Sequence, residues 1–197
     1  MTALRRSDLD PDPLRQLDRW RSAAAEAGVD TSIVVLATAA AGGQPAARTV
    51  LVKGLDEGVF HFFTNYESRK AIELAENPLA ALLFHWPGRQ VRIEGTVARL
   101  PADESDAYFD ARPPGSRLSA AVSPQSRPVE SRAGLEAAVE RLRERYPDGA
   151  VPRPESWGGY RLDPQVYEFW QHDRHRMHDR FRYTSADGAW TLERLGP

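Results

Sequence analysis

The chain has 197 residues and a mass of 22.0 kDa, with 41% hydrophobic and 27% charged residues, which excludes a disordered chain and predicts one domain over residues 1–197. Without cysteine there is no disulfide framework, and no apolar run approaches the ~20 residues of a membrane helix. A formal charge of −2 argues against a general nucleic-acid binder, and an N-terminus without a signal-peptide core predicts a cytoplasmic protein.

The first half of the chain predicts one helix followed by short strands. Asp12-Pro13 is typical of a helix start, and Leu14, Leu17 and Trp20 recur at helical spacing, so we expect a helix over about 13–27. Alternating or β-branched segments predict strands at 32–38, 46–53, 59–64, 79–86 and 90–100, with turns at 42–43, 56–58 and 87–88. Short helices are expected at 68–76 and 102–111.

The second half predicts a longer helix and then strands again. Ser131 is a candidate cap for that helix, whose apolar positions are Leu135, Val139, Leu142 and Tyr146. Strands are expected at 159–162, 166–171, 179–184 and 190–195, with a turn at 186–188. About nine strands with inserted helices favour a mainly β fold, an antiparallel barrel without exposed edges. A doubly wound α/β fold is the alternative, disfavoured because consecutive strands lie too close together for parallel crossovers.

A row of cationic residues alternates near the C-terminus. On a strand these residues would share one face, and the row comprises Arg174, Arg176, His178, Arg180 and Arg182. Like charges at this spacing repel, so they need solvent or anionic partners. A solvated edge strand is one interpretation; we favour a site for an anion or planar ligand, because aromatic residues flank the row. We reject a metal site at His172, His175 and His178, since the arginines would repel a divalent cation.

Two further segments are candidates for binding a phosphate. Among 26 lysines and arginines only Lys53 and Lys70 are lysine. Lys70 lies in the segment 64–70, where a predicted strand ends and a predicted helix begins beside hydroxyl groups. This arrangement is typical of a phosphate-binding site. The alternative is an ordinary helix cap with solvent-exposed cations. Tyr108, Arg112 and Ser116 offer a phenol, a guanidinium and a hydroxyl for a second phosphate, and core packing with a helix cap is the alternative.

Taken together, these motifs resemble the pyridoxine (pyridoxamine) 5′-phosphate oxidase family, which has an FMN-binding split β-barrel. The resemblance covers nearly the whole chain, and its most specific blocks are residues 48–53, 63–70, 89–91, 108–116, 123–126 and 168–180. It implies an FMN-dependent oxidase that converts pyridoxine 5′-phosphate or pyridoxamine 5′-phosphate to pyridoxal 5′-phosphate and reduces oxygen to hydrogen peroxide. It also implies a homodimer with FMN at the subunit interface and a C-terminal dimerisation and substrate region at about 157–197.

The resemblance also assigns roles to individual residues. It implies that FMN is bound by Arg48, Thr49, Val50, Leu51, Val52, Lys53, Phe63, Thr64, Arg69, Lys70, Gln90, Gln125, Ser126, Trp170 and Arg180. The substrate would contact Lys53, Tyr108, Arg112 and Ser116 through its phosphate, and Arg176 and His178 over its pyridine ring. Arg176 and His178 are the expected catalytic residues, and no metal is expected.

Three positions depart from the family pattern. Phe63 replaces the usual tyrosine, while Ser119 and Ala121 stand where glycine and tryptophan are expected, which opens space. One rival is therefore a phenazine-biosynthesis-type FMN oxidase that acts on a larger dihydro-aromatic substrate. Another is a non-catalytic protein that binds FMN or pyridoxal phosphate.

Overall fold

The computed structural model describes residues 2–54 and 58–197, so the turn predicted at 56–58 lies largely outside the described residues. In these ranges the chain forms five α-helices and eight strands. The helices are α1 (Pro13–Glu26), α2 (Arg69–Glu76), α3 (Ala102–Asp110), α4 (Pro114–Val122) and α5 (Arg132–Arg145), after a short 3-10 helix at Arg6–Asp8. The strands are β1 (Ile33–Ala39), β2 (Pro45–Leu51), β3 (Phe60–Asn65), β4 (Leu79–Trp86), β5 (Arg89–Arg99), β6 (Trp157–Gln171), β7 (Asp179–Ala186) and β8 (Ala189–Leu195).

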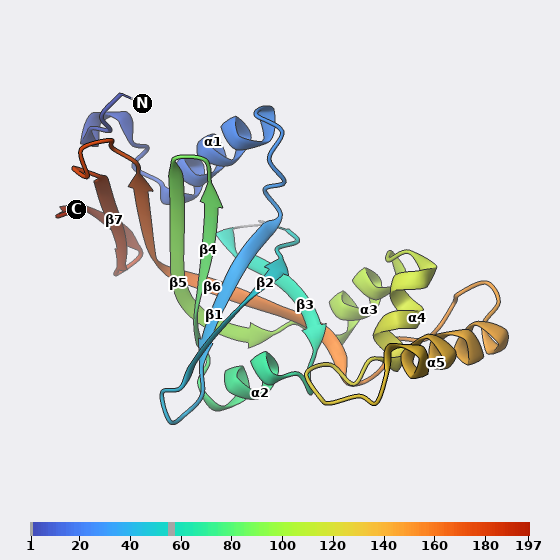
Figure 1. The fold of residues 1–197 in the computed structure, drawn as a ribbon. Coiled ribbons are helices and arrows are strands. Elements are labelled where there is room, and N and C mark those ends of the chain that lie inside the picture. Colours follow the sequence, from blue (N-terminus) through green and yellow to red (C-terminus); the bar gives the residue numbers. More distant parts are fainter. Residues whose placement is uncertain (1, 55–57) are drawn as a thin grey trace.

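The strands form one antiparallel sheet that closes into a barrel (Figure 1). Its order is β2-β1-β4-β5-β6-β7-β8, and β3 pairs with the first part of β6. A bridge between Val52 and Phe62 links the end of β2 to β3, and the amide of Lys53 donates to the carbonyl of His61 over 2.7 Å. The expectation of a mainly β antiparallel barrel with inserted helices is thereby confirmed, and the doubly wound alternative is wrong.

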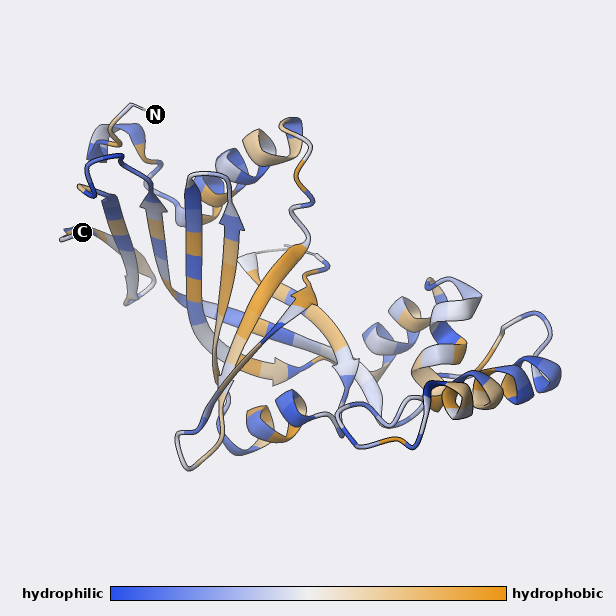
Figure 2. Cartoon of the chain, viewed as in Figure 1, coloured by the Kyte–Doolittle hydropathy of each residue, from blue (hydrophilic) through white to orange (hydrophobic). Residues whose placement is uncertain are grey.

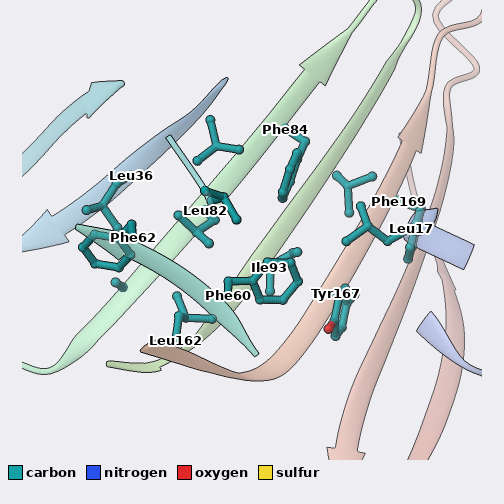
Figure 3. Packing of buried hydrophobic residues seen from close by; sticks show 14 of the residues in the cluster. Leu17, Leu36, Phe60, Phe62, Leu82, Phe84, Ile93, Leu162, Tyr167 and Phe169 are labelled. Carbon is teal, nitrogen blue, oxygen red and sulfur yellow. The ribbon is translucent and has the colours of Figure 1, made fainter. Parts of the chain in front are cut away.

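Apolar side chains from alternating strand positions fill the barrel (Figure 3). Leu36, Leu82 and Ile93 are fully buried there, and Figure 2 shows hydrophobic and hydrophilic residues alternating along β5. Helix α1 packs against the core near the end of β6, where the ring of Trp20 contacts that of Phe169 edge to face with centroids 5.2 Å apart. Each such side chain contributes about 1.5–3 kcal/mol by leaving water, so the barrel is a firm support for the elements around it.

The two strands predicted at 159–162 and 166–171 are one long strand, β6. Pro164 lies between them, and the pairing of β5 with β6 shifts register at Glu94 and Gly95, which accommodates the proline in an irregularity of the ladder. A Cβ on Gly95 would lie 2.1 Å from the carbonyl oxygen of Asp163, so the close approach requires glycine. As a result β6 extends from the α3 end of the barrel to β7.

Two helical expectations need correction. The helix expected at 102–111 is α3, but a further helix that was not expected, α4, follows it, with Pro114 in its first turn. Helix α5 forms where expected, yet none of its residues is buried. No helix in the described ranges combines the length and apolarity needed to cross a membrane.

The alternating cationic row is not one strand face. Strand β6 ends at Gln171 and β7 begins at Asp179, so only the last part of the row is extended. Between them the chain turns around Asp173, whose carboxylate accepts from the amide of His175 over 2.7 Å. Arg176 has a φ of 62°, in the left-handed region. The prediction from alternation was wrong because the spacing describes side-chain direction only where the backbone is extended.

Candidate functional site

The junction between β3 and α2 buries the ammonium group of Lys70. Its Nζ donates to the Gln125 side-chain oxygen over 2.9 Å, to the Thr64 hydroxyl over 3.0 Å and to the Ser68 hydroxyl over 3.2 Å. All three acceptors are neutral. Ser68 precedes the helix as expected, but its hydroxyl makes no capping bond with an α2 amide.

Beside Lys70, a carboxylate joins two arginines. Glu73 of α2 is 4% exposed and accepts from Arg48 Nη2 over 3.0 Å, from Arg69 Nε over 2.7 Å and from the Thr38 hydroxyl. Burial alone would raise the pKa of Glu73, but these hydrogen bonds outweigh burial and lower it. Arg48 also donates to the Leu36 carbonyl, so its guanidinium is held from two sides.

The electrostatics of this junction favour an anion. Burial, followed by the nearby charge of Arg48, lowers the pKa of Lys70 from 10.5 to about 8, while Glu73 acts in the opposite direction. A buried ammonium with only neutral hydrogen-bond acceptors is destabilised relative to water. A phosphate placed against Lys70 would supply the missing negative charge and raise its pKa again.

Lys70 and Lys53, the two rare lysines, line the same cavity of about 220 Å³, which we call the lysine cavity. Its lining comes from β2 and the residues after it, β3, α2, α3 and the residues after it, the segment after α4 and the start of β6. It comprises Thr49, Val50, Leu51, Lys53, Phe63, Thr64, Lys70, Tyr108, Arg112, Gln125 and Trp157. Cationic groups at two points and aromatic rings between them suit a flat molecule with a phosphate.

A second cavity of about 590 Å³ adjoins it, and we call this one the serine cavity. The two cavities share Phe63, Thr64, Arg112, Gln125 and Trp157. Helix α4 supplies the other wall with Ser116, Ser119 and Ala120. The departure noted at Ser119 therefore lies on a cavity wall.

Three stacked aromatic rings lie at the two cavities: Phe63 and Trp157 line both, and Tyr108 lines the lysine cavity. Phe63 and Tyr108 stack with centroids 3.7 Å apart, and Trp157 continues the stack 5.7 Å from Phe63. The guanidinium of Arg112 lies 4.6 Å from the Trp157 ring centre, in cation–π contact. Its Nη1 is buried with no hydrogen-bond partner among the described residues, and burial lowers the pKa of Arg112. A buried donor of this kind indicates a missing acceptor.

The other predicted site residues gather at the far end of β6. Gln90 pairs with Trp170 across β5 and β6, and Trp170 pairs with Arg180 across β6 and β7. The ring of His178 lies 4.7 Å from that of Trp170, and its Nδ1 accepts from the amide of Asp173 over 3.1 Å. Arg176 belongs to the same β6–β7 turn. Figure 1 shows this end of β6 on the opposite side of the barrel from α3 and α4.

One chain therefore brings the predicted residues together as two groups. The first group lies in or beside the two cavities. Two of its members, Arg69 and Ser126, line a neighbouring pocket, and Val52 forms the bridge between the end of β2 and β3. The second, which we call the β6–β7 group, does not line these cavities and comprises Gln90, Trp170, Arg176, His178 and Arg180. Among residues 2–54 and 58–197 no set of three or more acidic or histidine side chains is arranged to hold a metal.

Two residues at the site were not predicted. Trp157 lines both cavities. Its position before two glycines was the available signal, because Gly158 and Gly159 leave room for Tyr66 and Phe63. Glu73 had no signal in the sequence that set it apart from the other charged residues of α2. Its partners Thr38 and Arg48 come from β1 and β2, which are distant from α2 in the sequence.

Family models match most of the chain. Residues 23–146 match the model of pyridoxamine 5′-phosphate oxidase, and residues 157–197 match the pyridoxine 5′-phosphate oxidase C-terminal dimerisation region. A pyridoxine/pyridoxamine 5′-phosphate oxidase of Paraburkholderia phymatum is 54% identical over 195 residues, covering 97% of this chain and 92% of the relative. One of Salinibacter ruber is 51% identical over 200 residues, covering 98% and 93%.

Solved structures are similar over the whole fold. PhzG from Burkholderia lata 383, in complex with tetrahydrophenazine-1-carboxylic acid, has a TM-score of 0.92 and 31% identity, covering 100% of this chain and 99% of that chain. A pyridoxamine 5′-phosphate oxidase-related, FMN-binding protein of Nostoc punctiforme has a TM-score of 0.75 and 21% identity, covering 96% and 100%. The expected split-barrel fold is thereby confirmed.

Proposed function

The chain belongs to the pyridoxine/pyridoxamine 5′-phosphate oxidase family, and from that premise we propose which of its residues bind the cofactor and which bind the substrate. It is an FMN-dependent oxidoreductase that converts pyridoxine 5′-phosphate or pyridoxamine 5′-phosphate to pyridoxal 5′-phosphate, with oxygen reduced to hydrogen peroxide. The division of roles below is supported above all by the buried Lys70 ammonium, whose hydrogen-bond acceptors are all neutral.

The residues around Lys70 fit the phosphate end of FMN. Lys70 and Arg48 would bind phosphate oxygens, with Arg69 close by and Thr64 and Gln125 as polar neighbours. FMN lying along the 48–53 strand would then place its ring near Phe63. The remaining cofactor contacts of the proposal are Thr49, Val50, Leu51, Val52, Lys53, Ser126 and, from the β6–β7 group, Gln90, Trp170 and Arg180.

The substrate phosphate fits the other side of the lysine cavity. Arg112 presents an unpartnered buried Nη1, and Lys53 and Tyr108 line the same cavity. Ser116 lines the adjoining serine cavity, which Arg112 also lines. These four groups would anchor the phosphate in both the ground and the transition state, which lowers KM more than it raises kcat.

FMN held by these residues would supply the redox chemistry, as the two-electron acceptor for the substrate and the donor to oxygen. The contribution of the chain is to hold the two rings in contact and to exclude water from them. We assign Arg176 and His178 to the pyridine ring, where Arg176 orients the substrate and His178 offers a polar partner. The Asp173 amide donates to Nδ1 of His178, which leaves Nε2 to face the substrate.

The chain forms a homodimer through its C-terminal region. We propose that each site combines the cavities of one protomer with the β6–β7 group of its partner. The separation of the two groups along β6 supports this division, because the β6–β7 group of one chain does not line the two cavities of that chain. We further propose that residues 1–197 are a single domain with residues 157–197 as its dimerisation and substrate region. The cytoplasmic location stays a prediction.

Anaerobic reduction tests the assignment. Purified protein loaded with FMN is mixed without oxygen with pyridoxine 5′-phosphate, with pyridoxamine 5′-phosphate or with a dihydrophenazine acid. We expect the two vitamin phosphates to bleach the flavin absorbance. Bleaching by the phenazine compound alone would favour the rival hypothesis of a larger substrate. The volume of the serine cavity and the similarity to PhzG support that rival. No bleaching with any of them would favour a binding protein without turnover.

A further inference from the structure

Glu73 is a buried carboxylate for which the activity described so far has no use. It lies on the face of α2 that packs against β1, and only 4% of its surface is exposed. The ion pairs of Arg48 and of Arg69 are both made with Glu73, one through each carboxylate oxygen. The Thr38 hydroxyl of β1 adds a third hydrogen bond. Three elements, β1, β2 and α2, therefore meet at one carboxylate.

The geometry of Arg48 depends on this contact. Arg48 projects from β2, and its guanidinium reaches Glu73 over 3.0 Å and the Leu36 carbonyl over 3.2 Å. A long side chain of this kind has many rotamers when it is free. A carboxylate that accepts from the guanidinium removes that freedom before any ligand arrives, which is preorganisation.

The charges at the junction are matched to one phosphate. Arg48, Arg69 and Lys70 carry three positive charges and Glu73 carries one negative charge, so the cluster has an excess of about two. A phosphate monoester carries about −1.5 to −2 near neutral pH. With Glu73 in place, a single phosphate neutralises the cluster; without it, one positive charge would stay uncompensated beside the buried ammonium of Lys70.

We propose that Glu73 is the positioning residue of the FMN phosphate site, fixing the guanidinium groups of Arg48 and Arg69 beside Lys70. Glu73 itself does not touch the cofactor, since it carries the same sign of charge as the phosphate. This inference rests on the proposed function, in which these cations bind the phosphate of FMN. A purely structural tie between α2 and the sheet is the competing explanation.

Riboflavin separates the two explanations, because it has the flavin ring without the phosphate. The flavin is removed from the full-length protein, and the dissociation constants of FMN and riboflavin are measured by fluorescence for each variant. The ratio of the two constants does not depend on how much of a preparation is folded. Replacing Glu73 by alanine should weaken FMN at least tenfold and riboflavin less than twofold.

Two further variants sharpen the test. Glu73→Gln should give an intermediate loss of FMN binding, because one amide oxygen does not accept from all three donors. Glu76→Ala removes an exposed carboxylate from the same helix and should match the unmodified protein. Equal weakening of both flavins by Glu73→Ala would overturn the proposal in favour of a structural tie, and unchanged FMN binding by either Glu73 variant would overturn it as well.

Lys70→Met distinguishes failure of this inference from failure of the proposed function. If Lys70→Met lowers the preference for FMN over riboflavin while Glu73→Ala does not, the phosphate site stands and the role of Glu73 is wrong. If neither variant alters that preference, the phosphate does not bind at this junction, and the proposed cofactor site fails with the inference.

Discussion

Phe63 and Tyr108 stack face to face at the lysine cavity, with ring centroids 3.7 Å apart and planes inclined by 12°. Phe63 comes from β3 and is a proposed flavin contact, whereas Tyr108 comes from α3 and is a proposed substrate contact. The two binding functions therefore share one packing contact. A substitution of either ring is therefore expected to affect the binding of both FMN and the substrate.

The ring and the hydroxyl of Tyr108 should have separable effects. Tyr108→Phe keeps the stack and removes one hydrogen-bonding group, so KM for pyridoxine 5′-phosphate should rise about 2- to 10-fold, as for one hydrogen bond of ~0.5–1.5 kcal/mol. Tyr108→Ala removes the ring as well and should also weaken FMN binding. Steady-state kinetics and flavin titration check this. Identical behaviour of the two variants would argue against a role for the stack.

Arg112 and Arg176 should affect different kinetic constants. Arg112→Ala removes a phosphate anchor that acts in ground and transition states alike, so KM should rise at least tenfold with little change in kcat. Arg176→Ala should instead lower kcat, because it disturbs the orientation of the reacting ring. Both are measured with pyridoxamine 5′-phosphate at saturating oxygen. Equal effects on both constants in the two variants would refute this division.

The pKa of Lys70 predicts how flavin binding depends on pH. Because this pKa is lowered from 10.5 to about 8, the ammonium is charged below pH 8 and becomes neutral above it. The preference for FMN over riboflavin should therefore fall as the pH rises through 8, by up to about tenfold per pH unit. Lys70→Met should show a low preference without this fall. The pH-independent affinity of riboflavin serves as the internal control.

The same lowered pKa predicts the stability of the flavin-free protein. Between pH 8 and 10.5 the unfolded chain binds a proton on Lys70 that the folded chain has lost, so this residue makes stability rise with pH across that window. Urea unfolding at several pH values measures the slope. Lys70→Met should reduce it, and an unchanged slope would mean that Lys70 titrates normally.

Gly159 should be sensitive to the smallest substitution. A Cβ at this position would lie 2.4 Å from Leu100 Cδ1 and 2.7 Å from Phe63 Cε1, so Gly159→Ala must displace the aromatic wall. We expect a loss of about 1–3 kcal/mol in the free energy of unfolding and weaker flavin binding. Gly42→Ala is the matched control, because its Cβ would have no neighbour within 4 Å among the described residues. Equal melting temperatures for the two variants would contradict the expectation.

Mixed dimers test whether a site is shared between protomers. Lys70→Met damages the cavity group and Arg180→Ala damages the β6–β7 group, so each homodimer should be nearly inactive. In a mixed dimer both lesions fall in one site and the other site is intact, and random mixing should restore about a quarter of the activity of the unmodified protein. Co-refolding the two variants and assaying turnover measures this. No recovery would place both groups in the same protomer's site.

Local signals in the sequence determined the secondary structure well. Helix α1 begins where Asp12 was expected to cap it, and the Asp12 carboxylate accepts from the amide of Leu14 over 2.8 Å. Alternation of apolar residues located the strands, because a strand with one buried face has a period of two. The two rare lysines were singled out from composition, and they line one cavity.

Long-range contacts decided the rest. The pairing of β3 with β6 places Phe63 opposite Gly159 and so forms part of the wall of both cavities. The residues around each of the two positions contain no signal that predicts this pairing. Glu73 meets Arg48 only because β2 and α2 pack beside β1. The cationic row from Arg174 to Arg182 was expected to share one strand face, but residues 172–178 form the connection between β6 and β7. Periodicity and caps act within a few residues, whereas these contacts depend on how distant segments pack, which a local pattern does not specify.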